Sequence, residues 1–186
     1  MDAKTADSER VVLVNERDEE IGTEEKFRAH EMHLLHRAVS VFITNARREV
    51  LLQQRAATKY HSAGLWSNTT CGHPRPGEAL EVAARRRLRE EMGIDCLLTK
   101  AFEFTYSVEL ANGLAEHEFD HVFVGLWEGE PTPDPNEVDA WDWYGADTID
   151  AALREHVTSF SAWFPMAWAG VKARGIGGVD GNSGAP

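Results

Sequence analysis

The chain has 186 residues, with 19 Lys and Arg against 31 Asp and Glu, so its formal net charge is −12 with neutral histidines. This length suits one domain with one core, and the acidity argues against nucleic acid or an anionic membrane as a partner. Without an apolar signal region or a run of roughly 20 apolar residues, and with only Cys71 and Cys96, the chain is expected to be a cytoplasmic globular protein.

The predicted elements are mostly strands, with a few helices between them. Strands are expected at residues 11–15, 38–45, 49–55, 100–110, 114–127 and 140–144, and helices at residues 77–92, 147–156 and 160–173. Two hairpins are indicated, one at residues 46–48 and one at Asn112-Gly113. Residues 1–9 and 175–186 are expected to be flexible tails around one domain at 10–174. The pattern predicts an α+β fold, a mixed α/β sandwich.

The helix predicted over residues 77–92 has signals at both ends. Pro76 and Gly77 mark its start, and Gly93 follows its last turn. Apolar side chains recur every four residues and form the expected buried stripe: Leu80, Ala84, Leu88 and Met92. The other positions are largely charged, which is typical of a solvated helix face.

Charge is distributed unevenly along the chain. Residues 116–150 hold eleven acidic residues and no Lys or Arg, whereas residues 47–100 hold ten basic and six acidic residues. Such a chain can hold a cation near one segment and a phosphate near another. An acidic surface loop and a solvated basic helix face would explain the same distribution, and spacing alone favours that simpler interpretation.

The predicted helix lies within a motif of fixed spacing. Residues 72–94 resemble the Nudix box, with matches at Gly72, Glu78, Arg86, Leu88, Glu90, Glu91, Gly93 and Ile94. One position departs, because Arg87 stands where the box has a glutamate. The resemblance implies a Nudix-like fold, a central mixed β-sheet flanked by helices, whose carboxylates hold a divalent cation against a diphosphate. Arg87 weakens the case for hydrolysis but not for diphosphate binding.

The segment before this helix carries residues that a hydrolase does not require. Residues 66–74 read Trp-Ser-Asn-Thr-Thr-Cys-Gly-His-Pro and closely resemble a segment of type 1 isopentenyl-diphosphate isomerases, a branch of the Nudix fold. Further segments resemble that family in the same order, at residues 25–30, 35–42, 116–118 and 160–163, and the resemblance covers about residues 10–170. It implies an enzyme of isoprene biosynthesis that interconverts isopentenyl diphosphate and dimethylallyl diphosphate by a 1,3-allylic proton shift.

Several histidines and glutamates are candidate metal ligands. Glu116 and Glu118 are two apart in a predicted strand, so both carboxylates project from one face while His117 faces away. The candidate imidazoles are those of His30, His36 and His73. Such a set of nitrogens and carboxylate oxygens suits a six-coordinate Mn²⁺, Mg²⁺ or Zn²⁺ ion, and the ligand types do not choose among these metals.

The family resemblance also implies which residues transfer protons. Cys71 and Glu118 would act on opposite sides of the substrate, each within hydrogen-bond reach of it. Cys71 requires a polarised setting to act as a base, because an isolated thiol is mostly protonated at neutral pH. The protonated alkene resembles a tertiary carbocation, and the resemblance gives Trp163 the role of the aromatic face that stabilises it. Tyr106 is expected to assist Glu118 through a hydrogen bond.

The diphosphate is expected to bind the basic part of the chain. By the same resemblance, Lys26, Arg55 and Lys59 contact phosphate, and Glu91 binds a Mg²⁺ ion that accompanies the substrate. Arg87 is a weaker candidate because the sequence does not give its side-chain direction. The expected cofactors are therefore Mg²⁺ with the diphosphate and a second divalent metal, Mn²⁺, Mg²⁺ or Zn²⁺, at the His/Glu site. The expected partner is a small isoprenoid diphosphate.

The remaining histidines and the second cysteine receive a simpler interpretation. Surface or hydrogen-bonded roles are expected for His33, His61, His117, His121 and His156, and Cys96 is expected to be an inert thiol. Packing in the core or at its rim is expected for Trp66, Trp127, Trp141, Trp143 and Trp168.

Two other functions compete with the isomerase. One is a Nudix hydrolase that cleaves a nucleoside diphosphate derivative, against which Arg87 and the set of Cys71, His30, His36 and Glu118 argue. The other is an inactive Nudix-fold binding module, which is disfavoured because each candidate ligand and proton-transfer residue is present.

Overall fold

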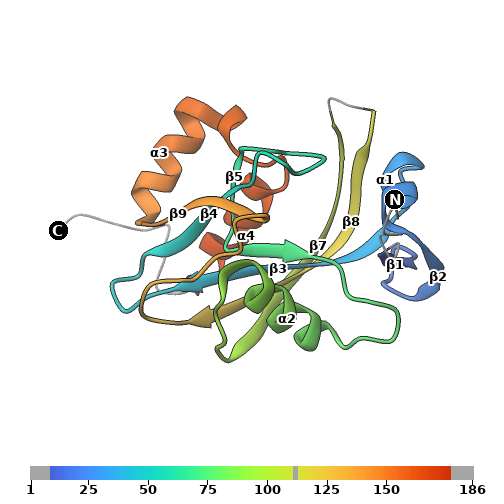
Figure 1. Cartoon of the computed structure of the whole chain (residues 1–186), viewed down its shortest axis with the longest axis horizontal. Helices are drawn as coiled ribbons and strands as arrows, with labels where there is room; N and C mark the ends of the chain where they lie inside the picture. The colour runs from blue at the N-terminus through green and yellow to red at the C-terminus, as the bar shows by residue number, and fades with distance from the viewer. Residues whose placement is uncertain (1–8, 111–112, 177–186) are drawn as a thin grey trace, which may run out of the picture.

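The structure is a computed structural model that describes residues 9–110 and 113–176 (Figure 1). Most of both expected tails, and Asn112 in the second hairpin, lie outside the described residues, so the flexibility of the tails remains a prediction. The described residues form a mixed sheet with four α-helices, which is the predicted α+β arrangement. None of these helices combines the length and the apolar character that crossing a bilayer requires.

Nine strands of the described residues join in one mixed sheet. They are β1 (Arg10–Val14), β2 (Glu20–Glu25), β3 (His36–Thr44), β4 (Val50–Arg55), β5 (Trp66–Ser67), β6 (Thr70–Gly72), β7 (Leu98–Glu109), β8 (Ala115–Leu126) and β9 (Val138–Tyr144). β3 is central, since it pairs in parallel with β8 and antiparallel with β1, β4 and β6. β3 pairs antiparallel with β4 at Thr44 and Val50, and β7 pairs antiparallel with β8. The antiparallel strand pairs of both predicted hairpins are therefore confirmed.

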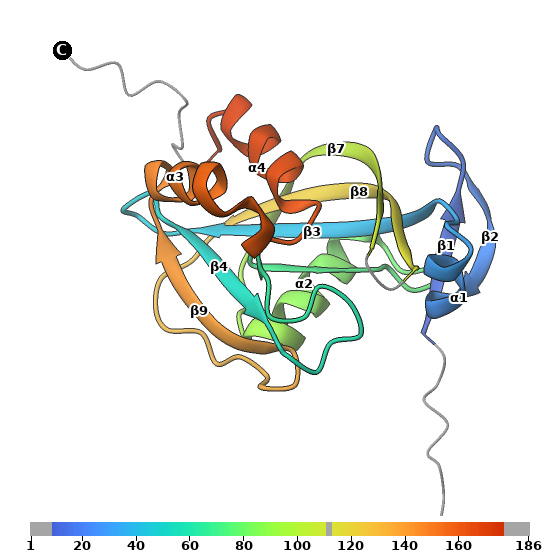
Figure 2. The ribbon, with the colours of Figure 1, turned by 90° about the horizontal axis from the view of Figure 1, so that it is seen from above.

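Helices cover both faces of the central strands (Figure 2). α2 (Leu80–Met92) packs on one face, against Val39 and Val41 of β3. α3 (Ala146–His156) and α4 (Phe164–Ala173) cover the other face, where Phe42 and Val122 are buried. The alternation follows from strand geometry, because successive side chains point to opposite faces. A polar side chain of β3 or β8 that shares the face of Phe42 and Val122 therefore points to the α3 and α4 side.

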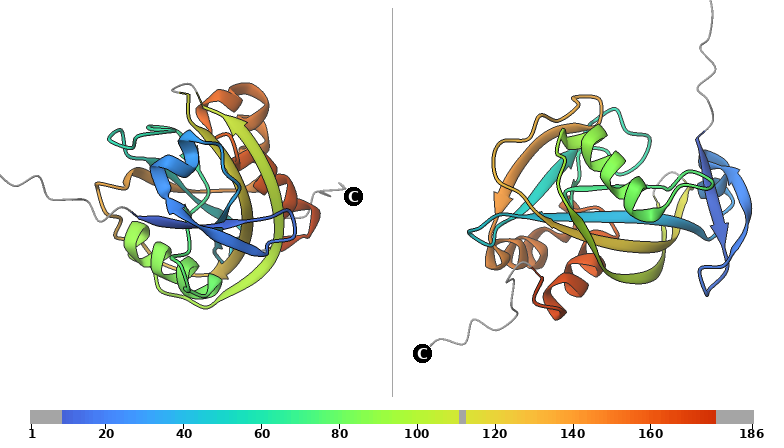
Figure 3. Two further views of the ribbon diagram at one scale, coloured as in Figure 1. Left: turned by 90° about the vertical axis from the view of Figure 1, so that its right-hand side faces the viewer. Right: turned by 90° about the horizontal axis from the view of Figure 1, so that it is seen from below.

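The β1–β2 hairpin and α1 (Lys26–Glu31) stand at one end of the molecule (Figure 3). The sequence pattern predicts neither β2 nor α1, because Ile21 is the one large apolar residue of β2 and α1 has only six residues. α1 begins where the Glu25 carboxylate accepts hydrogen bonds from the backbone N–H groups of Phe27 and Arg28, each at 3.2 Å. It buries Ala29 and His30. This short helix therefore delivers a histidine to the interior.

Two helices begin later than predicted. α2 begins at residue 80 rather than 77, because Glu78 belongs to a turn in which its N–H donates to Arg75 O at 2.9 Å and its carboxylate binds Arg86. α4 begins at residue 164 rather than 160, because Phe160 forms a parallel bridge with Trp66. In both cases a tertiary contact outweighs the local helical pattern.

Gly93 ends α2 in the left-handed conformation, with φ of 67°, and a Cβ atom there would lie 2.7 Å from the carbonyl oxygen of Thr132. We expect Gly93→Ala to lower the free energy of unfolding by about 2–4 kcal/mol, from backbone strain of about 1 kcal/mol and overpacking of about 1–3 kcal/mol. Gly77 has φ of 78° and open space around it, so Gly77→Ala should show the strain alone. Urea unfolding followed by circular dichroism measures both, and equal losses would contradict the packing contribution.

Candidate active site

A pocket is lined by side chains from α1, from the central strands and from α2, and by Trp163 just before α4. Its lining includes Lys26, Ser40, Arg55, Lys59, His61, Cys71, His73, Arg87, Tyr106, Glu116, Glu118 and Trp163. These residues come from segments far apart in sequence, which the sheet brings together. The pocket combines acidic, basic, thiol and aromatic groups within one cavity.

The register of the central strands explains this convergence. His36 of β3 lies directly opposite Glu118 of β8, and Ser40 lies opposite Cys71 of β6. β3 therefore separates the strand that carries the thiol from the strand that carries the carboxylate. Residues opposite each other share a face of the sheet, so both groups point to the α4 side. Glu116 joins them because it is two residues from Glu118 on the same strand.

The histidines near β3 are held through one ring nitrogen. His30 Nδ1 donates to the backbone oxygen of Lys26 at 2.7 Å, and His36 Nδ1 donates to that of Leu34 at 2.8 Å. These bonds place a proton on Nδ1 of each ring and direct Nε2 of both rings toward the interior, where it faces Glu116 or Glu118. His73 Nε2 lies 3.2 Å from His36 Nε2. A histidine that donates one N–H to a backbone carbonyl is the usual arrangement of a metal ligand.

This cluster fits a divalent metal ion. The ligand atoms of His30, His36, His73 and Glu118 all lie within 4.8 Å of one another, and all four residues are buried. Within residues 9–110 and 113–176, the buried atoms His30 Nε2 and His73 Nδ1 have no hydrogen-bond partner. Buried polar atoms without partners are rare, and a bound cation would satisfy an inward-facing nitrogen. Glu116 lies at the edge of the cluster, with Oε2 at 3.4 Å from His30 Nε2.

The carboxyl groups on this face of β8 differ in charge. Burial acts to raise the pKa of Glu118, but hydrogen bonds from His36 and His73 hold that pKa well below its usual value. Burial and the charge of Glu118 raise the pKa of Glu116 to about 7. Burial and the same charge raise the pKa of Asp120 to about 8. Negative charge is therefore concentrated on Glu118.

His61 belongs to the pocket, although the sequence suggested only a surface or hydrogen-bonded role for it. Its side chain is 8% exposed, Nδ1 lies 3.2 Å from Glu116 Oε1, and its ring stacks on that of His30. Burial and the nearby Arg55 lower the pKa of His61 to about 2, so the ring is neutral. The residue follows Lys59 in a loop without periodic patterning, so no pattern in the sequence indicated its burial.

Cys71 has a polarised setting. Arg55 Nη1 donates to Cys71 Sγ at 3.7 Å, and the guanidinium carbon of Arg55 lies 5.4 Å from the ring centroid of Trp163. Burial raises the pKa of the Cys71 thiol to about 12, while the Arg55 charge acts in the opposite direction. The thiol is therefore protonated at neutral pH and lies beside a cation and an aromatic ring.

Trp163 and Tyr106 are each held by one hydrogen bond. Trp163 Nε1 donates to Asn68 Oδ1 at 3.1 Å, which fixes the indole at the start of α4. Tyr106 Oη donates to Glu118 Oε2 at 2.7 Å, because the two residues are opposite each other on β7 and β8. Glu118 Oε1 lies 2.8 Å from His73 Nε2, so its two oxygens have different partners.

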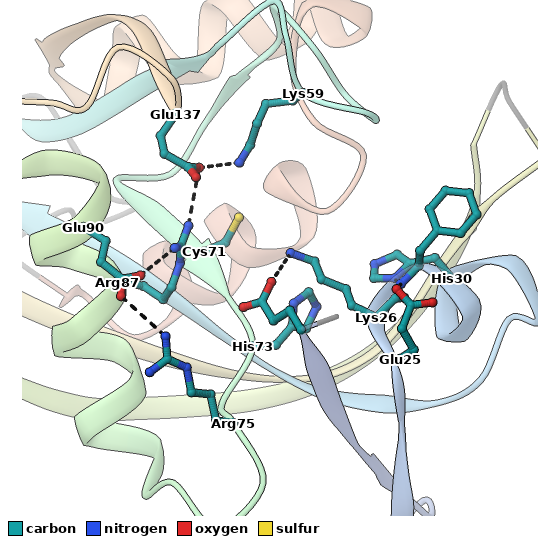
Figure 4. A network of polar contacts seen from close by, with 12 residues as sticks. Glu25, Lys26, His30, Lys59, Cys71, His73, Arg75, Arg87, Glu90 and Glu137 are labelled. Carbon is teal, nitrogen blue, oxygen red and sulfur yellow. Dashed lines mark hydrogen bonds and ion pairs between the residues drawn. The ribbon is translucent and has the colours of Figure 1, made fainter. Parts of the chain in front are cut away.

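Basic side chains converge on the pocket from three segments (Figure 4). Lys26 Nζ binds Glu9 at 2.9 Å, and Lys59 Nζ binds Glu137. The side chain of Arg87 also lines the pocket, which is the direction that the sequence left open. Gly72 leaves room for this side chain, because a Cβ atom at Gly72 would lie 2.8 Å from Arg87 Nε. Lys26, Lys59 and Arg87 therefore each have a carboxylate partner.

Glu91 does not join the pocket lining in the described part of the chain. Its carboxylate is buried, accepts a hydrogen bond from Gln53 Nε2 at 2.6 Å and pairs with Arg87. It therefore lies behind Arg87 as seen from the pocket.

Of the other histidines, His33 and His156 are exposed, and His117 Nδ1 donates to the backbone oxygen of His33 at 3.0 Å. His121 is buried, with Nε2 at 3.1 Å from Asp18 Oδ2, on the face of β8 away from the pocket. Cys96 is a half-buried free thiol against the α2 core. These four histidines and Cys96 therefore lie outside the pocket that contains Cys71, Glu118 and Trp163.

Comparisons with known proteins identify both the fold and the relatives. Residues 34–164 match the NUDIX domain family. "Isopentenyl-diphosphate Delta-isomerase 1" of Aromatoleum aromaticum is 53% identical to this chain, and the match covers 83% of this chain and 88% of the relative. "Isopentenyl-diphosphate Delta-isomerase 2" of the same organism is 49% identical, and the match covers 83% of this chain and 82% of the relative. The crystal structure of DR0079 from Deinococcus radiodurans is similar in fold, with a TM-score of 0.67 and 23% identity over 80% of this chain and 90% of that one. The chain therefore belongs to the isopentenyl-diphosphate Delta-isomerase family, and its NUDIX domain supplies most of the pocket lining.

Proposed function

We propose that the protein interconverts isopentenyl diphosphate and dimethylallyl diphosphate by a 1,3-allylic proton shift. The observation that carries this proposal is the meeting of Cys71, Glu118 and Trp163 in one pocket with basic side chains. The reaction needs one group to give a proton to the double bond and another to remove a proton from the neighbouring carbon. Cys71 and Glu118 are these groups, because they stand on strands on either side of β3.

The basic side of the pocket binds the diphosphate. Lys26, Arg55 and Lys59 would contact phosphate oxygens, Arg55 through its planar guanidinium and the lysines as point charges. Arg87 is a fourth cation of the same wall. A Mg²⁺ ion bound with the substrate would be held by Glu91, and the ion would take the place of Arg87 as the partner of that carboxylate.

A second divalent ion, Mn²⁺, Mg²⁺ or Zn²⁺, would be held by His30, His36, His73, Glu116 and Glu118, and when bound it would change the proton affinity of the Glu118 carboxyl group. Tyr106 orients Glu118 by donating to the oxygen that faces away from His73. Trp163 presents an aromatic ring to the centre that becomes positively charged, and its buried position excludes water there.

The catalytic unit is one domain at residues 10–174, and the protein acts in the cytoplasm. Both described cysteines are free thiols, which agrees with a reducing compartment. Its partner is a small isoprenoid diphosphate.

A labelling experiment in D₂O tests the reaction directly. Incubation with isopentenyl diphosphate and Mg²⁺ should give dimethylallyl diphosphate that contains solvent deuterium, without release of phosphate. Mass spectrometry of the product and a phosphate assay measure both outcomes. Release of phosphate from nucleoside diphosphate derivatives, with no alkene isomerisation, would instead support the Nudix hydrolase.

A further inference from the structure

Glu137 lies just before β9 and contacts two cations of the pocket wall (Figure 4). Its Oε2 pairs with Lys59 Nζ and lies 3.4 Å from Arg87 Nη2. Lys59 and Arg87 line the pocket, whereas in the described part of the chain Glu137 is not one of the lining residues. The Glu137 carboxylate therefore contacts two cations that line the pocket, but it does not line the pocket itself.

The backbone of Glu137 is fixed from two directions. Its carbonyl oxygen accepts from Ala56 N at 2.9 Å, at the end of β4, and its own N–H donates to Asp134 O at 2.9 Å. Asp134 N in turn donates to Glu91 O at 3.0 Å, at the end of α2. The residue thus joins the segment that carries Lys59 to the helix that carries Arg87. A carboxylate on such a fixed backbone has a defined direction.

The two cations depend on Glu137 to different extents. Arg87 also pairs with Glu90 and Glu91 of its own helix. Within residues 9–110 and 113–176, Glu137 is the acidic residue that forms an ion pair with Lys59. A free lysine side chain has many rotamers, and ordering it when a ligand binds costs affinity. The loss of Glu137 would therefore release the Lys59 side chain. It would also remove the negative charge that offsets the repulsion between Lys59 and Arg87.

We propose that Glu137 is a positioning residue for the diphosphate, which holds the ammonium group of Lys59 beside the guanidinium group of Arg87 before the ligand arrives. This inference rests on the proposed function, because it names the diphosphate as the ligand of the same wall. Glu137 acts through the two cations and does not contact the substrate. If the Glu137 carboxylate instead competed with phosphate for the cations, its removal would raise the affinity for the diphosphate.

Glu137→Gln tests the proposal, because it keeps the side-chain volume and removes the charge. Calorimetric titration with inorganic pyrophosphate and Mg²⁺ should give a Kd about 10-fold higher than for the unchanged protein, which is the size expected for a lost charge-assisted hydrogen bond. With isopentenyl diphosphate, KM should rise by a similar factor while kcat stays within about twofold, the pattern of lost uniform binding. In a Lys59→Met background, the same change should add less than about threefold, since the two residues act as a pair.

Asp139→Asn is the matched control. The Asp139 carboxylate accepts from Ala57 N at 2.8 Å, so it supports the same turn and carries the same charge, but it touches neither Lys59 nor Arg87. Its Kd for pyrophosphate should stay within about twofold, as for independent sites. Three results would each overturn the proposal. They are an equal loss of pyrophosphate affinity in Asp139→Asn, a lower Kd in Glu137→Gln, and a fall in the kcat of Glu137→Gln at unchanged Kd. Pyrophosphate binding needs no turnover, so it tests Glu137 even if no isomerisation is found.

Discussion

Cys71→Ala is expected to lower kcat on the order of 10²–10⁴-fold, the usual contribution of a positioned acid or base. The thiol lies in a pocket beside Arg55 and Trp163, and alanine has no group that could exchange a proton there. The change removes one sulfur atom from the pocket wall, so the fold should remain intact. Turnover of isopentenyl diphosphate and circular dichroism measure these two effects separately.

Cys96→Ala provides the control for Cys71. Cys96 is also a free thiol, but it packs against the α2 core and lies away from the pocket. Its substitution should leave kcat within about twofold and cost some stability, as expected for a small loss of buried volume. Near-normal activity in Cys71→Ala would remove this residue from proton transfer.

Glu118→Gln is expected to have an effect of similar size, on the order of 10²–10⁴-fold in kcat. Glutamine keeps the shape of the side chain and an oxygen that can accept from Tyr106. It cannot take up and release a proton as a carboxylate does, and it removes the negative charge near His36 and His73. Kinetics with isopentenyl diphosphate provide the measurement.

Metal binding must be followed in the same variant, because Glu118 is also a proposed ligand. Titration with Mn²⁺ separates a protein that lost its metal from one that binds metal and cannot transfer protons. Glu103→Gln is a suitable control, since Glu103 lies on β7 with a side chain 48% exposed and pairs with Lys100. Activity close to that of the unchanged protein in Glu118→Gln would contradict its proposed role.

The sequence predicted the strands and helices that have strong patterns. β3, β7 and β8 are long and rich in β-branched and aromatic residues, and Gly93 ends α2 as expected from its position. β2 and α1 gave no such signal. β2 has no buried face, and α1 is held by its Glu25 cap and by the burial of His30. Elements that depend on tertiary contacts could not be read from local periodicity.

The candidate site was predictable where a motif or a strand register fixes it. The pattern of Glu116 and Glu118 correctly placed both carboxylates on one face, because the alternation of a strand is a local property. The direction of Arg87 and the burial of His61 were not predictable. They depend on how the segments at residues 55–65 and 132–138 pack against α2, which is a long-range property of the chain.

The parallel ladder between β3 and β8 also limits how relatives of this chain can vary in length. The strands match residue for residue from His36 and Glu118 to Thr44 and Leu126. An inserted or deleted residue inside either stretch would turn the side chains beyond it to the opposite face. The cluster of candidate metal ligands would then lose the His36 imidazole or the Glu118 carboxylate without any substitution. We therefore expect gain or loss of residues at the connecting turns, such as residues 45–49, and not within these two strands.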